Sequence, residues 1–130
     1  MKILVGFDGS RVSEAALNLA AEHAQAFDAQ ILLVQSMTGG PEMLRSDFEN
    51  AERELISRKN QFREKNIACE SLLSVRGLSP GEDLVRLAKE HTVNEIIVGV
   101  RRRSKVGKLV FGSTAQFVIL NAPCPVVTVK

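Results

Sequence analysis

The feature that most constrains the fold is a repeated switch between short apolar runs and longer stretches whose apolar residues recur at helical spacing. The runs are nearly continuous, as is typical of strands buried on both faces of a parallel sheet. They lie at 2–7, 30–36, 67–75, 94–100 and 125–130. The intervening segments are long enough for the crossovers that parallel strands require. The sequence therefore predicts an α/β fold, an open doubly wound sheet with helices on both faces.

The segments between these runs carry the signals of helix starts. Ser10 is placed to cap the first helix, and Pro41 is placed at the start of the second. Ser79, Pro80 and Glu82 have the spacing of a cap, a first helical position and a capping box. We therefore expect helices over 12–27, 42–65 and 80–91, and a last helix after Gly112.

Length and composition favour one domain over residues 1–130. A chain of 130 residues with 45% hydrophobic residues can bury a core without disulfides or metals. The apolar run before Asp8 is too short for a signal peptide, and no run approaches the ~20 residues of a membrane helix. Cys69 and Cys124 form no CxxC pair and are expected to be reduced, small apolar side chains. We expect a cytoplasmic protein.

Positive charge is concentrated in residues 99–114, "GVRRRSKVGKLVFGST". This stretch holds five cations and no acid, whereas the whole chain has 17 Lys and Arg against 15 Asp and Glu. Without the stretch the balance is 12 against 15, so the net charge changes from +2 to −3. A solvated surface loop is one interpretation, and a site for an anionic ligand is the other.

The position of this stretch favours the anion site. Ligands of open α/β sheets bind beyond the carboxyl ends of the strands. Gly99 ends the fourth run, where the backbone could approach a ligand without a Cβ in the way. Gly112, Ser113 and Thr114 open the last helix, whose free N–H groups and dipole attract phosphate. The chain has no Walker A loop here, and no GxGxxG motif follows the first run.

The spacing Gly99, two residues, Arg102, nine residues, Gly112-Ser113 resembles the G-x2-G-x9-G-[S/T] pattern of the universal stress protein family. "KILVGFDGS", "ILLVQS" and "APCPVVTVK" resemble that family's first, second and closing strands, so the likeness covers essentially the whole chain. It implies a Rossmann-like sheet of five parallel strands in the order 3-2-1-4-5. It also implies frequent homodimers and, in one branch, ATP along the strand ends.

The resemblance implies a nucleotide site for ATP or AMP, with or without Mg²⁺. Asp8 would face the nucleoside, with Phe7 next to it, although a core role for Phe7 is favoured. Val98 and Gly99 would line the base and ribose side, and Gln35 would lie near adenine. The loop and helix start would bind phosphate through Arg102, Ser104, Gly112, Ser113 and Thr114.

Arg102 stands where the family pattern has its middle glycine. An arginine in a left-handed backbone costs about 1–2 kcal/mol. A hydrogen bond from a guanidinium to phosphate contributes about 1.5–3 kcal/mol. The two effects oppose each other at similar size, so both a nucleotide-binding regulator of the stress response and a nucleotide-free interaction module of the same fold stay open.

Two other functions are disfavoured. The absence of Trp and Tyr leaves few stacking platforms for nucleic acid, and the net charge is only +2. No triad, metal-ligand cluster or dedicated general base is evident, so any ATPase activity should be slow. The expected partners are a nucleotide, unidentified proteins and a second copy of the chain. The second copy would pair with the exposed edge of the closing strand. The residues expected at this interface are Val126, Val127, Thr128 and Val129.

Overall fold

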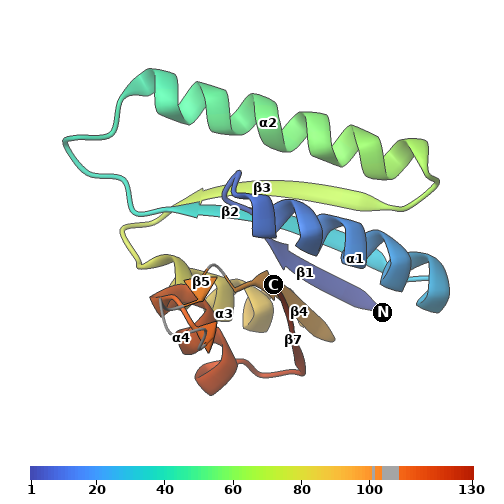
Figure 1. Cartoon of the computed structure of the whole chain (residues 1–130). Helices are drawn as coiled ribbons and strands as arrows, with labels where there is room; N and C mark the ends of the chain where they lie inside the picture. The colour runs from blue at the N-terminus through green and yellow to red at the C-terminus, as the bar shows by residue number, and fades with distance from the viewer. Residues whose placement is uncertain (101, 104–108) are drawn as a thin grey trace.

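The computed structural model describes residues 1–100, 102–103 and 109–130. Its main sheet contains five parallel strands in the order β3-β2-β1-β4-β7 (Figure 1), which confirms the predicted fold class and strand order. The strands are β1 Lys2–Gly6, β2 Gln30–Met37, β3 Cys69–Val75, β4 Glu95–Gly99 and β7 Val126–Val129. The helices are α1 Arg11–Phe27, α2 Arg45–Glu64, α3 Pro80–Glu90 and α4 Ser113–Asn121.

Helices cover the two faces of this sheet in pairs. One face packs against α1 and α2 through a core that includes Val5, Phe7, Leu17, Leu55 and Phe62. The opposite face packs against α3 and α4 in a second core. That core includes Leu4, Val34, Leu84, Val98 and Val118. The central strands β1 and β4 have three consecutive buried residues each, which explains why their sequences show no polar alternation.

A two-stranded antiparallel hairpin interrupts the chain between β4 and α4. It consists of β5 Arg102–Arg103 and β6 Leu109–Val110, with Arg102 opposite Val110. The sequence analysis did not predict these strands, because each has only two residues and carries no periodicity. Arg102 therefore lies in an extended segment, a backbone conformation that arginine adopts readily.

The start of α2 differs from the prediction. The helix begins at Arg45, so Pro41 and Glu42 lie in a turn before it rather than in its first turn. The N–H of Leu44 donates to the Asp47 carboxylate at 3.1 Å, an interaction that stabilises a helix start. The buried residues of α2 are Ala51, Leu55 and Phe62. Leu44 is exposed because it precedes the first turn.

The other predicted helix starts are confirmed in part. Ser10 caps α1 by accepting the Ser13 N–H at 3.3 Å. Pro80 is at the first position of α3, as predicted, but the Ser79 side chain makes no capping hydrogen bond.

The two cysteines are free thiols in the structure. Burial raises the pKa of the Cys69 thiol to about 12, so this side chain packs as an apolar group.

Candidate functional site

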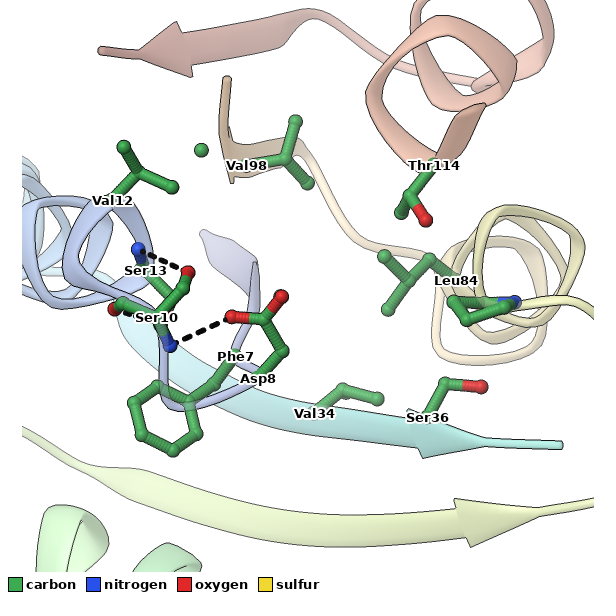
Figure 2. Close-up of a pocket in the computed structure, with 13 residues that line it drawn as sticks. Phe7, Asp8, Ser10, Val12, Ser13, Val34, Ser36, Leu84, Val98 and Thr114 are labelled. Carbon is green, nitrogen blue, oxygen red and sulfur yellow. Dashed lines mark hydrogen bonds between the residues drawn. The ribbon is translucent and has the colours of Figure 1, made fainter. Parts of the chain in front are cut away.

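The strand order reverses direction between β1 and β4, because the chain winds outward from β1 through β2 to β3 and then returns to the other side of β1. The helices that follow β1 and β4 therefore leave on opposite faces, and a crevice opens at the carboxyl ends of these two strands. A pocket of about 240 Å³ lies at this place. Figure 2 shows side chains from both faces of the sheet converging on it.

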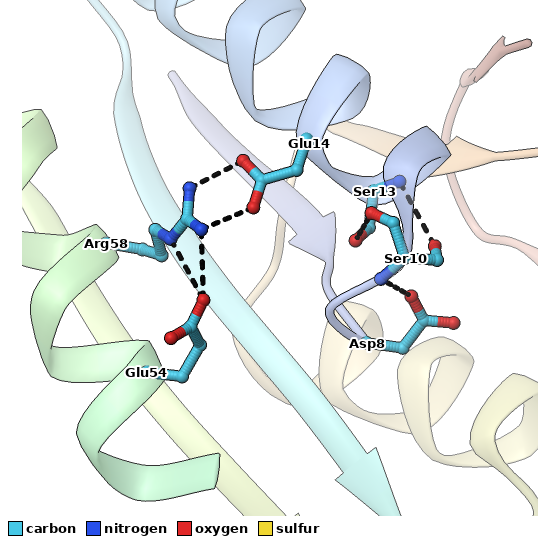
Figure 3. Close-up of polar contacts among 6 residues, drawn as sticks. All are labelled: Asp8, Ser10, Ser13, Glu14, Glu54 and Arg58. Atoms are coloured by element: carbon cyan, nitrogen blue, oxygen red, sulfur yellow. Dashed lines mark hydrogen bonds and ion pairs between the residues drawn. The ribbon is translucent and has the colours of Figure 1, made fainter. Parts of the chain in front are cut away.

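The start of α1 forms one wall of the pocket. Ser10, Val12 and Ser13 line it, and Asp8 lies in the preceding turn. The Ser10 N–H donates to Asp8 Oδ1 at 2.9 Å, and the buried Ser13 hydroxyl donates to the Ser10 carbonyl at 2.7 Å. These hydrogen bonds, drawn in Figure 3, fix the turn "DGS" so that the Asp8 side chain lies at the pocket.

The opposite wall comes from α3 and α4. Pro80 and Leu84 contribute from α3, and Thr114 contributes from the first turn of α4. A small residue allows the two helices to approach here, since a Cβ on Gly81 would lie 2.8 Å from Phe117 Cβ. The pocket therefore receives the N-terminal turns of three helices, whose dipoles make it favourable for an anion.

Apolar side chains cover much of the remaining pocket surface. Val34 projects from β2, Val98 from β4 and Leu84 from α3, and all three are buried. Ser36 lies two residues after Val34 on the same face of β2 and lines the pocket beside them. An apolar slot with a few placed polar groups is the usual composition of a small-molecule site.

An ionic network centred on the buried carboxylate of Asp83 lies behind Ser36. The Asp83 carboxylate accepts hydrogen bonds from the Ser36 hydroxyl at 2.6 Å and from Arg76 Nε at 2.8 Å. Arg76 also pairs with Glu90 at 3.0 Å. Burial acts to raise the pKa of Asp83, but hydrogen bonds from Ser36, Ser74 and Arg76, with the charge of Arg76, outweigh it. The pKa of Asp83 therefore lies below its ordinary value, and the carboxylate is ionised at neutral pH.

The structure brings five of the sequence-predicted site residues to this pocket. They are Phe7, Asp8, Val98, Gly99 and Thr114. Figure 2 shows the Phe7 ring directed away from the pocket centre, and the ring is buried in the core beneath α1 and α2. The favoured core role of Phe7 is therefore confirmed.

Gly99 is required for a reason that the sequence did not suggest. A Cβ at this position would lie 2.8 to 3.0 Å from Val12, including 3.0 Å from the Val12 backbone carbon. The glycine thus allows the start of α1 to pack on the end of β4, which closes one side of the pocket.

The other predicted residues lie elsewhere. Gln35 points to the opposite face of β2 and lines an open depression that adjoins the pocket and shares Phe7 and Asp8 with it. Gly112 and Ser113 are exposed at the start of α4 and do not line the pocket. The backbone of Arg102 lies in β5, and Ser104 lies outside the described residues.

Sequence reasoning missed several lining residues. These are Gly6, Ser10, Val12, Ser13, Val34, Ser36, Pro80 and Leu84. Ser10 and Pro80 carried a signal, since their positions at helix starts place them beside strand ends. Val34 and Leu84 are indistinguishable in sequence from ordinary core residues.

Comparison with known proteins places the chain in a family. The model of the universal stress protein family matches residues 1–130. The chain belongs to the universal stress protein family. A universal stress protein of Thermus aquaticus is 32% identical over 134 residues, covering 98% of this chain and 97% of the relative. The resemblance inferred from the sequence motifs is thereby confirmed.

Solved universal stress protein structures agree with this fold. One from Archaeoglobus fulgidus has a TM-score of 0.89 and 37% identity, over 100% of this chain and 98% of that one. A second, from the same organism and in complex with dAMP, has a TM-score of 0.84 and 33% identity with the same coverage. Within the described residues, no helix is both long and apolar enough to span a membrane.

Proposed function

We propose that this universal stress protein binds an adenine mononucleotide, AMP or ATP, in the pocket between β1 and β4, and acts in the stress response as a regulator. The observation that carries the proposal is the relative from Archaeoglobus fulgidus, which matches the whole chain at 33% identity and was solved with dAMP. The pocket's place at the point where the sheet reverses direction supports it independently.

The residues of the pocket fit such a ligand. Val34, Leu84 and Val98 offer an apolar slot for a base, and the Asp8 carboxylate can accept hydrogen bonds from ribose hydroxyls. Thr114 and the free N–H groups of the α4 N-terminus can bind phosphate. Arg102, Ser104, Gly112 and Ser113 would extend this phosphate site, as the family spacing implies. A volume of about 240 Å³ is just below the usual range for small-molecule sites.

The proposal assigns the protein a binding role rather than a catalytic one. If the nucleotide is ATP with Mg²⁺, the ion's ligands would be phosphate oxygens and water, because Asp8 is assigned to the ribose. Regulation would then follow from bound nucleotide changing the dimer state or the affinity for a protein partner.

Calorimetric titration with AMP, and with ATP in the presence and absence of Mg²⁺, tests the proposal. Thr114→Ala removes a hydroxyl from the pocket and should weaken binding by about five- to tenfold. Thr38→Ala makes the same change at an exposed residue outside the pocket and should leave the affinity unchanged. Wild-type protein that binds neither nucleotide at millimolar concentration would overturn the proposal.

Arg102 supports a second candidate function. Because it replaces the middle glycine of the family pattern, the same fold could serve as an interaction module without nucleotide. That function would leave the titration flat for the wild type and for Arg102→Gly alike. Binding that appears only in Arg102→Gly would show that the arginine closes the site.

We also propose that two copies pair through β7. This strand lies at the edge of the sheet, and Val126, Val127 and Val129 pack inward against the two cores. The carbonyls of Pro125 and Val129 accept hydrogen bonds from the N–H groups of Ile96 in β4 and of Val100 directly after it. Because backbone groups alternate in direction along a strand, those of Val126 and Thr128 face outward, where a second copy can pair.

Proline substitutions distinguish this dimer from simple damage to the sheet. Thr128→Pro removes an outward N–H and should yield a folded monomer by light scattering. Val127→Pro removes an N–H that faces β4 and should destabilise the fold itself. A wild type that is monomeric at micromolar concentration would contradict the proposed dimer.

A further inference from the structure

Ser36 is the lining residue whose hydrogen-bonding capacity is most constrained. Its hydroxyl donates to Asp83 Oδ2 at 2.6 Å, the short distance of a charge-assisted hydrogen bond. The Asp83 side chain is 1% exposed, and a carboxylate that is ionised can only accept. Arg76 Nε also donates to Asp83 at 2.8 Å, and Ser74 further favours the charged form, so the charge is stabilised from several sides.

A serine hydroxyl has one hydrogen and two lone pairs. With the hydrogen committed to Asp83, Ser36 can offer the pocket only an acceptor. A ligand donor, N–H or O–H, would be matched here. A ligand carbonyl or ring nitrogen at the same place would face a lone pair and lose its hydrogen bonds to water without replacement.

The surroundings of Ser36 indicate which part of a nucleotide would meet it. Val34 precedes it by two residues on the same strand face, and Leu84 follows Asp83 on α3. Both are apolar and buried, so this part of the pocket suits the base. The phosphate belongs at Thr114, where the α4 N-terminus provides free N–H groups.

We propose that Ser36, held by Asp83 as an acceptor, is a specificity-determining residue that selects bases carrying an exocyclic amino group, such as adenine. The inference rests on the proposed nucleotide function and assigns the base preference of that site to one side chain. Asp83 is a positioning residue in this arrangement, because it acts on the ligand through Ser36.

Ser74 provides a matched control within the same network. Ser74 also stabilises the charged form of Asp83, but it lies on β3 and does not line the pocket. Ser74→Ala and Ser36→Ala therefore each remove a hydroxyl that stabilises the charge of the same carboxylate. Only Ser36→Ala removes an acceptor that a ligand can reach.

The experiment is a calorimetric titration of the wild type, Ser36→Ala and Ser74→Ala with AMP and with purine riboside 5′-monophosphate, in which hydrogen replaces the amino group. We expect the wild type to bind AMP about tenfold more tightly than the analogue. The ratio should fall to about one in Ser36→Ala and stay near ten in Ser74→Ala. A ratio of affinities does not depend on the folded fraction, so modest destabilisation of a variant leaves it interpretable.

The other outcomes separate this inference from the proposed function. A wild-type ratio of about one overturns the role of Ser36 and leaves nucleotide binding standing. A ratio near ten in all three proteins means that the amino group is recognised elsewhere, which also overturns it. A ratio that falls equally in both variants means that loosening of Asp83, rather than contact with Ser36, is responsible. Failure of every protein to bind either nucleotide overturns the proposed function and this inference together.

Discussion

Two arginine-centred networks lie on opposite faces of the sheet. On one face Arg58 of α2 pairs with Glu14 of α1 at 2.5 Å and with Glu54 at 2.9 Å (Figure 3), and its guanidinium lies 5.6 Å from the Phe7 ring centroid. On the other face Arg76 pairs with Asp83 at 2.6 Å and with Glu90 at 3.0 Å. Each arginine therefore joins two carboxylates.

The networks differ in the burial of their acids. The Glu14 and Glu54 side chains are 37% and 45% exposed, so both would be hydrated without Arg58. The Asp83 side chain is 1% exposed and would remain a buried charge without Arg76, which is itself 37% exposed. The cost of breaking each network is therefore set by the exposure of the carboxylate left without its partner, rather than by the exposure of the arginine.

Arg76→Ala should have the largest effect on stability. Loss of the arginine leaves the Asp83 carboxylate buried with only hydroxyl partners, at a cost of about 3 kcal/mol in the free energy of unfolding. Urea unfolding at pH 7 measures this difference. Glu90→Ala is the control, because it removes a half-exposed partner of Arg76 and should cost less than about 1 kcal/mol. Equal losses in the two variants would contradict the role of burial.

The pH dependence of that loss is the next largest effect. In the wild type the pKa of Asp83 is lowered, so its contribution to stability is present above the unfolded-state pKa near 3.8 and is lost as the pH falls through the folded-state pKa. In Arg76→Ala the burial of Asp83 remains, and burial raises a carboxyl pKa. In this variant, protonation of Asp83 at low pH removes the unpaired buried charge and so reduces the loss of stability.

The difference in unfolding free energy between wild type and Arg76→Ala should therefore narrow as the pH falls from 6 to 3. Urea unfolding of both proteins across this range tests it. A gap that stays constant with pH would mean that Asp83 is not the group that Arg76 stabilises.

Features that depend on local sequence could be predicted, whereas contacts between distant segments could not. Alternation of buried runs and helical spacing identified the five strands of the main sheet, because crossovers and burial leave few alternatives. Their order was implied by the resemblance to the universal stress protein family and not by the pattern itself. The Ser10 cap was readable because a cap is local in sequence.

The wall of the pocket was not readable in this way. Residues 31–34 are buried in a continuous apolar run, so β2 shows no alternation that would tell which of Gln35 and Ser36 faces the pocket. Asp83 resembles an ordinary acid in the first turn of a helix. Its role depends on Ser36 and Ser74, which only the tertiary fold brings beside it.

The sequence identified Gly99 as important but not the reason for it. The sequence indicated that a glycine was needed at the end of β4, and it attributed the need to a ligand. The structure shows that Val12 of α1 occupies the space that a Cβ would take. A glycine signals a close approach, but the approaching group can be named only from the packing.

Replacing Arg58 should have the smallest effect. Arg58→Ala removes two ion pairs to acids that water can hydrate, together with the contact over Phe7, and should cost about 1 kcal/mol. Arg58→Met keeps an apolar chain over the ring and removes only the charge, so it separates packing from ion pairing. Urea unfolding in low and high salt measures both variants. The loss in Arg58→Met should shrink in high salt, because screening weakens half-exposed pairs in the wild type. A loss above about 3 kcal/mol for either variant would show that the acids on this face are as dependent on their arginine as Asp83 is on Arg76.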